Sequence, residues 1–223
     1  MKVGLIYTST TPELIELVER EVKKQLGDGV ELFSLQDPSI LADVRAAGYV
    51  TAAPAARLIG MYMQAAEAGV DAMLNLCSSV GEVADSAQDI ARYIGVPIVR
   101  VDEEMCREAV RLGCRIGVMA TLPTTLEPTK STIARVAREA GKHVELIDCL
   151  VDGAFGLDQA QFRARLTEAA ADIADRVDVV VLAQGSMAYA EPHLESVYGK
   201  PFLGSPRFGA AELKNALQRK GCI

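Results

Sequence analysis

A short stretch decides the fold of this chain: Asn75–Gly81, with the sequence NLCSSVG. It follows the apolar run Val70–Leu76 and precedes Glu82–Ile94, whose apolar residues recur with helical periodicity. Cys77 is therefore expected at a strand-to-helix turn of an α/β protein. In open parallel sheets such turns are where ligands bind.

The residues of this turn suit a reactive thiol. The free backbone N–H groups at the start of the following helix favour a thiolate and also attract a substrate carboxylate. Ser78, Ser79 and Gly81 are small, so the backbone can approach a ligand closely. The alternative interpretation is a buried cysteine at a strand end, which is a common place for a free cysteine.

Composition limits the classes of protein to which the chain can belong. Its 223 residues are 50% hydrophobic, enough for one large domain or two lobes, and its net charge of -7 argues against a nucleic-acid partner. No apolar run is long enough to cross a membrane, and the chain begins directly with a strand pattern, so we expect a cytoplasmic protein. Five scattered cysteines and two histidines predict reduced thiols and no metal site.

Strand and helix patterns alternate along the first half, which predicts a mainly parallel sheet. Thr11 and Pro12 have the residue types of an N-cap and a first helical position. The segments expected in order are a strand Lys2–Tyr7, a helix to about Leu26, a strand Val30–Ser34, a helical region Ile40–Gly69 with Pro54 as a break or a new start, the Cys77 strand, the helix Glu82–Ile94 and a strand Ile98–Val101.

The second half repeats landmarks of the first. The segment Arg115–Thr121 echoes Lys2–Thr8 at an offset of 113 (121 − 8), and Val177–Ser186 echoes Val70–Ser79 at an offset of 107 (184 − 77). A third echo, near Pro97 and Pro201, follows in the same order. One such echo could be chance, but the ordered set predicts two pseudo-symmetric lobes with the active site in the cleft between them.

The layout resembles the aspartate/glutamate/hydantoin racemase superfamily over essentially the whole chain. The segments that carry the resemblance are the turn Asn75–Gly81, the segment Gly117–Thr125, the turn Leu182–Met187 and the segment Ser205–Gly209. The resemblance implies a cofactor-independent isomerase in which each lobe presents a cysteine to one face of the substrate α-carbon. It also implies a first lobe of residues 1–101 plus 210–223, a second lobe of 102–209, and possible pairing into a homodimer.

The chemistry implied by this resemblance assigns roles to residues of both turns. Removing the hydrogen next to a carboxylate needs a positioned base, for which Cys77 is the candidate, and donors that stabilise the enediolate. Donors and other substrate-binding residues are expected among backbone amides, hydroxyls and side-chain amides: Ser9, Asn75, Ser78, Ser79, Thr121, Gln184, Gly185 and Ser186. Helix capping is the alternative role for Ser9 and Thr121.

The sequence departs from the family at the second cysteine, where it has Gln184. An amide cannot accept and return a proton at neutral pH, so a two-cysteine inversion is not available. Three hypotheses follow. The chain is an isomerase that uses Cys77 as base or nucleophile on a small carboxylate substrate. Alternatively, it is a lyase that decarboxylates a small di-acid or oxo-acid, or a non-catalytic protein that binds a small carboxylate.

Overall fold

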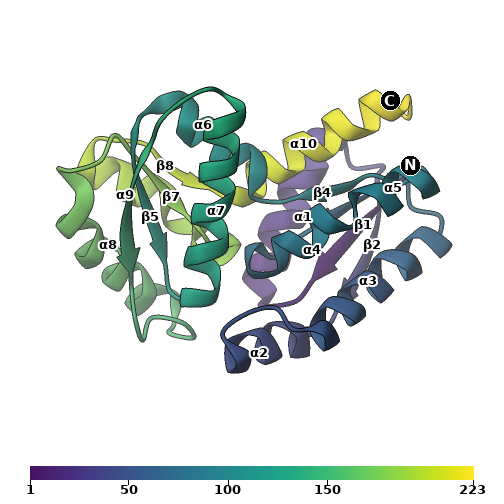
Figure 1. The fold of residues 1–223 in the computed structure, drawn as a ribbon, viewed down its shortest axis with the longest axis horizontal. Coiled ribbons are helices and arrows are strands. Elements are labelled where there is room, and N and C mark those ends of the chain that lie inside the picture. The colour runs from purple at the N-terminus through teal and green to yellow at the C-terminus, as the bar shows by residue number, and fades with distance from the viewer. The chain divides into compact units, whose positions relative to one another are not determined.

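Two four-stranded parallel sheets organise the chain, and each forms the centre of its own compact unit (Figure 1). The computed structural model describes residues 1–223. The first unit contains Met1–Val101 and Pro206–Ile223, and the second contains Asp102–Ser205. The predicted α/β architecture with two similar halves is confirmed.

The first unit has the strand order β2-β1-β3-β4. Its strands are β1 (Lys2–Tyr7), β2 (Glu31–Gln36), β3 (Ala72–Asn75) and β4 (Ile98–Arg100). Its helices are α1 (Pro12–Leu26), α2 (Pro38–Ala47), α3 (Ala52–Glu67), the 3-10 turn η1 (Ser78–Val80), α4 (Gly81–Ser86), α5 (Gln88–Ile94) and α10 (Ser205–Lys220).

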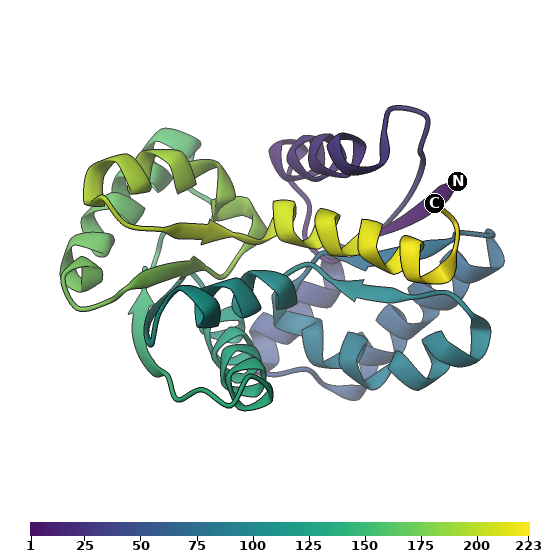
Figure 2. The same cartoon turned by 90° about the horizontal axis from the view of Figure 1, so that it is seen from above.

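Strand alternation divides the core of the first unit between the two faces of its sheet. On one face Val3 and Leu5 pack against α1 and α10, which lie side by side in Figure 2. On the other face Ile6, Met73 and Cys77 pack against α2, α3 and α4. Cys77 therefore lies on the α3 side of the sheet, opposite to α1.

Helix boundaries follow the sequence signals closely at α1 and less closely elsewhere. The hydroxyl of Thr11 accepts a hydrogen bond from the N–H of Leu14, and Pro12 is the first helical residue, as predicted. The helix expected over Glu82–Ile94 is instead two helices, α4 and α5, which meet at Ala87. Side chains compete with the backbone there, because Gln88 donates from Nε2 to the carbonyl of Ala84.

The second unit repeats the strand order of the first, as β6-β5-β7-β8. Its strands are β5 (Arg115–Ala120), β6 (Glu145–Leu150), β7 (Val179–Leu182) and β8 (Phe202–Gly204). Helices α6 (Glu103–Leu112) and α7 (Pro123–Glu139) pack on one face, and α8 (Gln159–Ala174), the 3-10 turn η2 (Gly185–Ala190) and α9 (Glu191–Tyr198) pack on the other.

Strand register shows that the two units are equivalent residue by residue. Gly4 pairs with Met73 in the first unit, and Gly117 pairs with Val180 in the second. These pairs differ by the same offsets that the sequence repeat gives, 113 (117 − 4) and 107 (180 − 73). The internal repeat is therefore a repeat of structure, and Cys77 corresponds to Gln184.

The two units also share an aspartate that fixes the start of their central strands. Asp71 accepts a hydrogen bond from the N–H of Lys2 at 2.9 Å, and Asp178 accepts one from the N–H of Arg115 at 2.9 Å. The guanidinium of Arg115 adds a bond to Asp178 at 2.7 Å. Together with the Arg115 and Cys114 N–H groups, it lowers the pKa of Asp178 to about 2.

Candidate functional site

Cys77 follows β3 directly and begins the turn into η1. Its backbone is extended (φ -148°, ψ 115°), and Ser78 starts the 3-10 turn. The thiol is buried, with 9% of the residue exposed. The strand-to-helix position predicted for Cys77 is therefore where the structure places it, at the carboxyl end of a central parallel strand.

Opposing effects act on the ionisation of Cys77. Burial is the largest and raises the pKa of the thiol, because a charge in a low-dielectric interior is poorly solvated. Donors near the sulfur lower the pKa: the Thr8 hydroxyl, the N–H groups of Ser79 and Val80, and the Ser79 hydroxyl. The net shift is upward. The backbone N–H groups favour the thiolate as expected, but burial outweighs them.

Thr8 is a member of this site that the sequence analysis did not select. It follows β1 directly and is fully buried. Its hydroxyl has no hydrogen-bond partner in the structure, and as a donor near Cys77 it favours the thiolate. Two signals could have identified it: its place in the hydroxyl run Thr8–Thr11, and its match to Thr121 in the repeat.

Gln184 occupies the corresponding place in the second unit. It follows β7 with an extended backbone (φ -112°, ψ 136°) and precedes η2. Its Oε1 accepts a hydrogen bond from the N–H of Thr121 at 2.7 Å, and its Nε2 donates to the Thr121 hydroxyl at 2.8 Å. The pair Thr121 and Gln184 thus repeats the pair Thr8 and Cys77, with an amide in place of the thiol. Thr121 caps no helix, since the N-cap of α7 is Leu122.

The turn after Cys77 packs against a buried guanidinium. The side chain of Arg100, at the end of β4, is 4% exposed and bonds to Asp85 in α4 at 2.6 Å. A Cβ atom added to Gly81 would lie 2.3 Å from Nη2 of Arg100, so a larger residue there would displace the guanidinium. In the second unit the glycine is on the strand and not on the turn. Gly204, at the end of β8, packs against Ala188 of η2.

The remaining predicted residues divide between the two units. In the first unit, Asn75, Ser78 and Ser79 are buried around Cys77, and Ser9 is half-buried beside Thr8. The Ser78 hydroxyl has no hydrogen-bond partner. In the second unit, half-buried Gly185 and Ser186 begin η2 next to Gln184, and Thr121 is buried. Each unit therefore gathers its own set at the carboxyl ends of its central strands.

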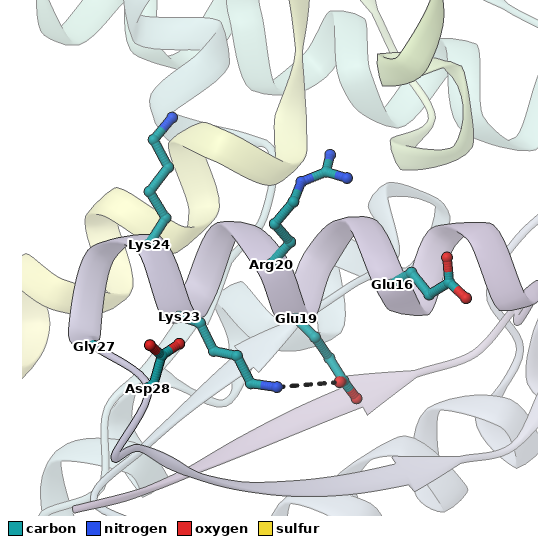
Figure 3. A pocket seen from close by; sticks show the side chains of 7 residues that line it. All are labelled: Glu16, Glu19, Arg20, Lys23, Lys24, Gly27 and Asp28. Carbon is teal, nitrogen blue, oxygen red and sulfur yellow. Dashed lines mark ion pairs between the residues drawn. The ribbon is translucent and has the colours of Figure 1, made fainter.

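A separate hollow of about 550 Å³ lies along α1, on the sheet face opposite to Cys77. Figure 3 shows its charged side chains spreading away from the helix, with Lys23 paired to Glu19 at 4.0 Å. Its lining consists of Glu16, Glu19, Arg20, Lys23, Lys24, Gly27 and Asp28. Charges of both signs that face solvent do not form a site for a specific ligand, so the hollow is not a second candidate.

No group of three or more His, Cys, Asp or Glu side chains is arranged to hold a metal ion. None of the helices combines the length and the apolar character that crossing a bilayer requires.

Comparison with known proteins supplies the context for this arrangement. The family model described as Asp/Glu/Hydantoin racemase matches residues 3–213. No curated protein sequence gives a significant match. Among solved structures, allantoin racemase from Klebsiella pneumoniae has 20% identity and a TM-score of 0.67, over 99% of this chain and 89% of that one. Glutamate racemase from Bacillus anthracis has 16% identity and a TM-score of 0.73, over 98% and 82%. Aspartate racemase from Picrophilus torridus has 13% identity and a TM-score of 0.67, over 99% and 94%.

Proposed function

We propose, from the premise that this chain belongs to the Asp/Glu/Hydantoin racemase family and is thus an isomerase, that it transfers a proton at the carbon next to a carboxylate in a small acid. Cys77 is the base or nucleophile, and the reaction needs no organic cofactor. The observation that carries this proposal is the set of donors around one thiol: the Thr8 hydroxyl and the Ser79 and Val80 N–H groups all favour the Cys77 thiolate.

The raised pKa of Cys77 fits a group that gives and takes protons. A hydrogen next to a carboxylate is very weakly acidic, so the base must be strong, and a thiol with a raised pKa gives a strongly basic thiolate. The donors around the sulfur hold the thiolate once it forms. The buried Ser78 hydroxyl, which has no partner, is an additional donor for the enediolate oxygen.

Because Gln184 stands at the position that corresponds to Cys77, the proposed reaction uses one thiol and not two. Its Oε1 is held by Thr121, so its Nε2 is oriented and can donate to a substrate carboxylate. It cannot carry a proton between states. We propose that Cys77 exchanges the proton on one face of the carbon and that Gln184 anchors a carboxylate of the substrate. Water or another group then serves the opposite face.

The experiment that tests this proposal is proton NMR in D2O with a panel of small substrates. The panel contains aspartate, glutamate and allantoin, for which the relatives are named, together with hydroxy, oxo and unsaturated di-acids. We expect deuterium to enter next to the carboxylate or carbonyl of one substrate. Loss of carboxylate instead would identify a lyase, and binding without any reaction would identify a carboxylate-binding protein.

Cys77→Ala is the decisive variant, and Cys149→Ala is its matched control. Cys149 is also a buried free cysteine, but it lies in β6 of the second unit and contacts the Ala169 carbonyl at 3.6 Å. Deuterium exchange should vanish in Cys77→Ala and persist in Cys149→Ala. Exchange that survives in folded Cys77→Ala would contradict the proposal.

A further inference from the structure

A chain of two buried hydrogen bonds leads from helix α3 to the backbone of Cys77. The hydroxyl of Tyr62 donates to Oδ1 of Asn75 at 3.0 Å, and Nδ2 of Asn75 donates to the carbonyl of Cys77 at 3.1 Å. Tyr62 is fully buried and Asn75 is 1% exposed. Neither residue is reached by solvent, so neither bond can be replaced by water.

The direction of these bonds fixes the orientation of the Asn75 amide. Because the Tyr62 hydroxyl donates, the amide oxygen must face Tyr62 and the amide nitrogen must face the Cys77 carbonyl. Without the hydroxyl, the buried oxygen of Asn75 would lose its donor. The amide could then turn over and place its oxygen against the Cys77 carbonyl, where two acceptors repel each other.

A buried amide at the end of an apolar strand costs stability unless all its bonds are made, so its presence calls for a reason. The second unit has no such amide: the residue that corresponds to Asn75 is Leu182 (182 − 75 = 107), which packs in the apolar core. Of the two units, only the one that contains the cysteine has a buried amide at this position.

We propose that Tyr62 is a positioning residue that acts through Asn75 to hold the Cys77 backbone, and so aims its sulfur at the Thr8 hydroxyl and the Ser79 and Val80 N–H groups. The importance of this link for turnover rests on the proposed function. The link itself is a property of the Cys77 turn and can be tested without any substrate.

The test measures the alkylation of Cys77 by iodoacetamide as a function of pH, followed by mass spectrometry of the peptide that contains Cys77. Tyr62→Phe removes only the hydroxyl. We expect the apparent pKa of Cys77 to rise and its alkylation at neutral pH to slow about fivefold, the equivalent of one net hydrogen bond. Arg100 and Asp85, the charged groups near Tyr62, are unchanged in this variant.

Tyr198→Phe is the matched control, because it removes a hydroxyl that donates to the Thr167 carbonyl in the second unit. It should lower the melting temperature by a similar amount and leave the Cys77 profile as in the wild type. Asn75→Ala provides a second, independent arm. If Tyr62 acts through Asn75, adding Tyr62→Phe to Asn75→Ala should change the profile no further.

An unchanged profile in Tyr62→Phe, a shift to lower pH, or effects of the two substitutions that add in full would each overturn this inference. Alkylation that behaves as expected in a protein without Cys77-dependent turnover would reject the proposed function and leave the inference standing. Cys77-dependent turnover together with an unchanged alkylation profile in Tyr62→Phe would support the proposed function and overturn the inference.

Discussion

The side-chain oxygen of Gln184 lies 2.7 Å from the backbone nitrogen of Thr121, which donates a hydrogen bond to it. By register this pair corresponds to Cys77 and Thr8 in the other unit. The second turn thus shares the extended backbone and the neighbouring hydroxyl that surround the cysteine, with an amide in place of the thiol.

Gln184→Cys should place a second thiol beside the Thr121 hydroxyl. Because Thr121 corresponds to Thr8, the new thiolate would have an equivalent donor, and the second unit would gain a base. We expect inversion of configuration to speed up relative to deuterium exchange, measured by chiral chromatography of the products. Gln184→Ser, which adds no such base, is the control. Equal rates in the two variants would contradict the prediction.

Thr8→Val should weaken the thiolate of Cys77 without unfolding the protein. The Thr8 hydroxyl has no other partner, so valine of similar shape loses only the bond to the thiolate. A hydrogen bond to a charged group is worth about 1.5–3 kcal/mol, which corresponds to a fall in Cys77 alkylation at neutral pH of roughly tenfold or more.

The pH profile gives the sign of the Thr8 effect. Alkylation should rise with pH beyond the ordinary thiol range near ~8.5, because burial raises the pKa of Cys77, and Thr8→Val should move the rise to still higher pH. Ser9→Ala, next in sequence, should leave the profile in place. A Thr8→Val profile that coincides with the wild type would show that the hydroxyl is not a thiolate donor.

Gly81→Ala should destabilise the first unit. The new Cβ would lie 2.3 Å from Nη2 of Arg100, so the guanidinium would have to leave the bond with Asp85. Overpacking of this kind costs about 1–3 kcal/mol, measurable by urea denaturation. Gly60→Ala is the control, because Gly60 lies within α3 with nothing within 4 Å of the added Cβ, and it should stabilise by about 0.5–1 kcal/mol. A Gly81→Ala protein as stable as the wild type would refute the packing argument.

Asp178 should contribute to stability in a defined acid range. Its pKa is lowered to about 2 in the folded protein, so it stabilises the fold above the unfolded pKa near ~3.9, and this contribution is lost as pH falls toward 2. Asp178→Asn should lower the melting temperature at pH 7 and show a smaller loss between pH ~4 and ~2 than the wild type. Parallel curves for the two proteins would exclude this role.

The sequence predicts the architecture better than the site. Apolar strand segments, the Thr11 cap and the ordered repeat are local or pairwise patterns, and all three reappear in the structure. Tyr62 was not predicted, because a tyrosine in an apolar helix reads as ordinary core and only the fold brings it to Asn75. Ser9 was predicted instead of Thr8, because the run of hydroxyl residues does not show which of them lies near Cys77.

The sequence also predicts only some of the effects that determine the pKa of Cys77. The turn motif predicts N–H groups near the sulfur, and these are present at Ser79 and Val80. The extent of burial depends on how α2, α3 and α4 close over the turn, which a motif does not contain. Burial has the larger effect on the pKa of Cys77, and it could not be predicted without the tertiary structure.

The first unit is made of two separate segments of chain, whereas the second is one uninterrupted segment, and this affects the order of folding during synthesis. A ribosome completes Asp102–Ser205 before it releases Leu213 and Leu217, which fill the α1 side of the first sheet. The half that contains Cys77 consequently finishes folding last. A chain cut short after Ser205 would keep an intact second half and leave the reactive half with an open, aggregation-prone core.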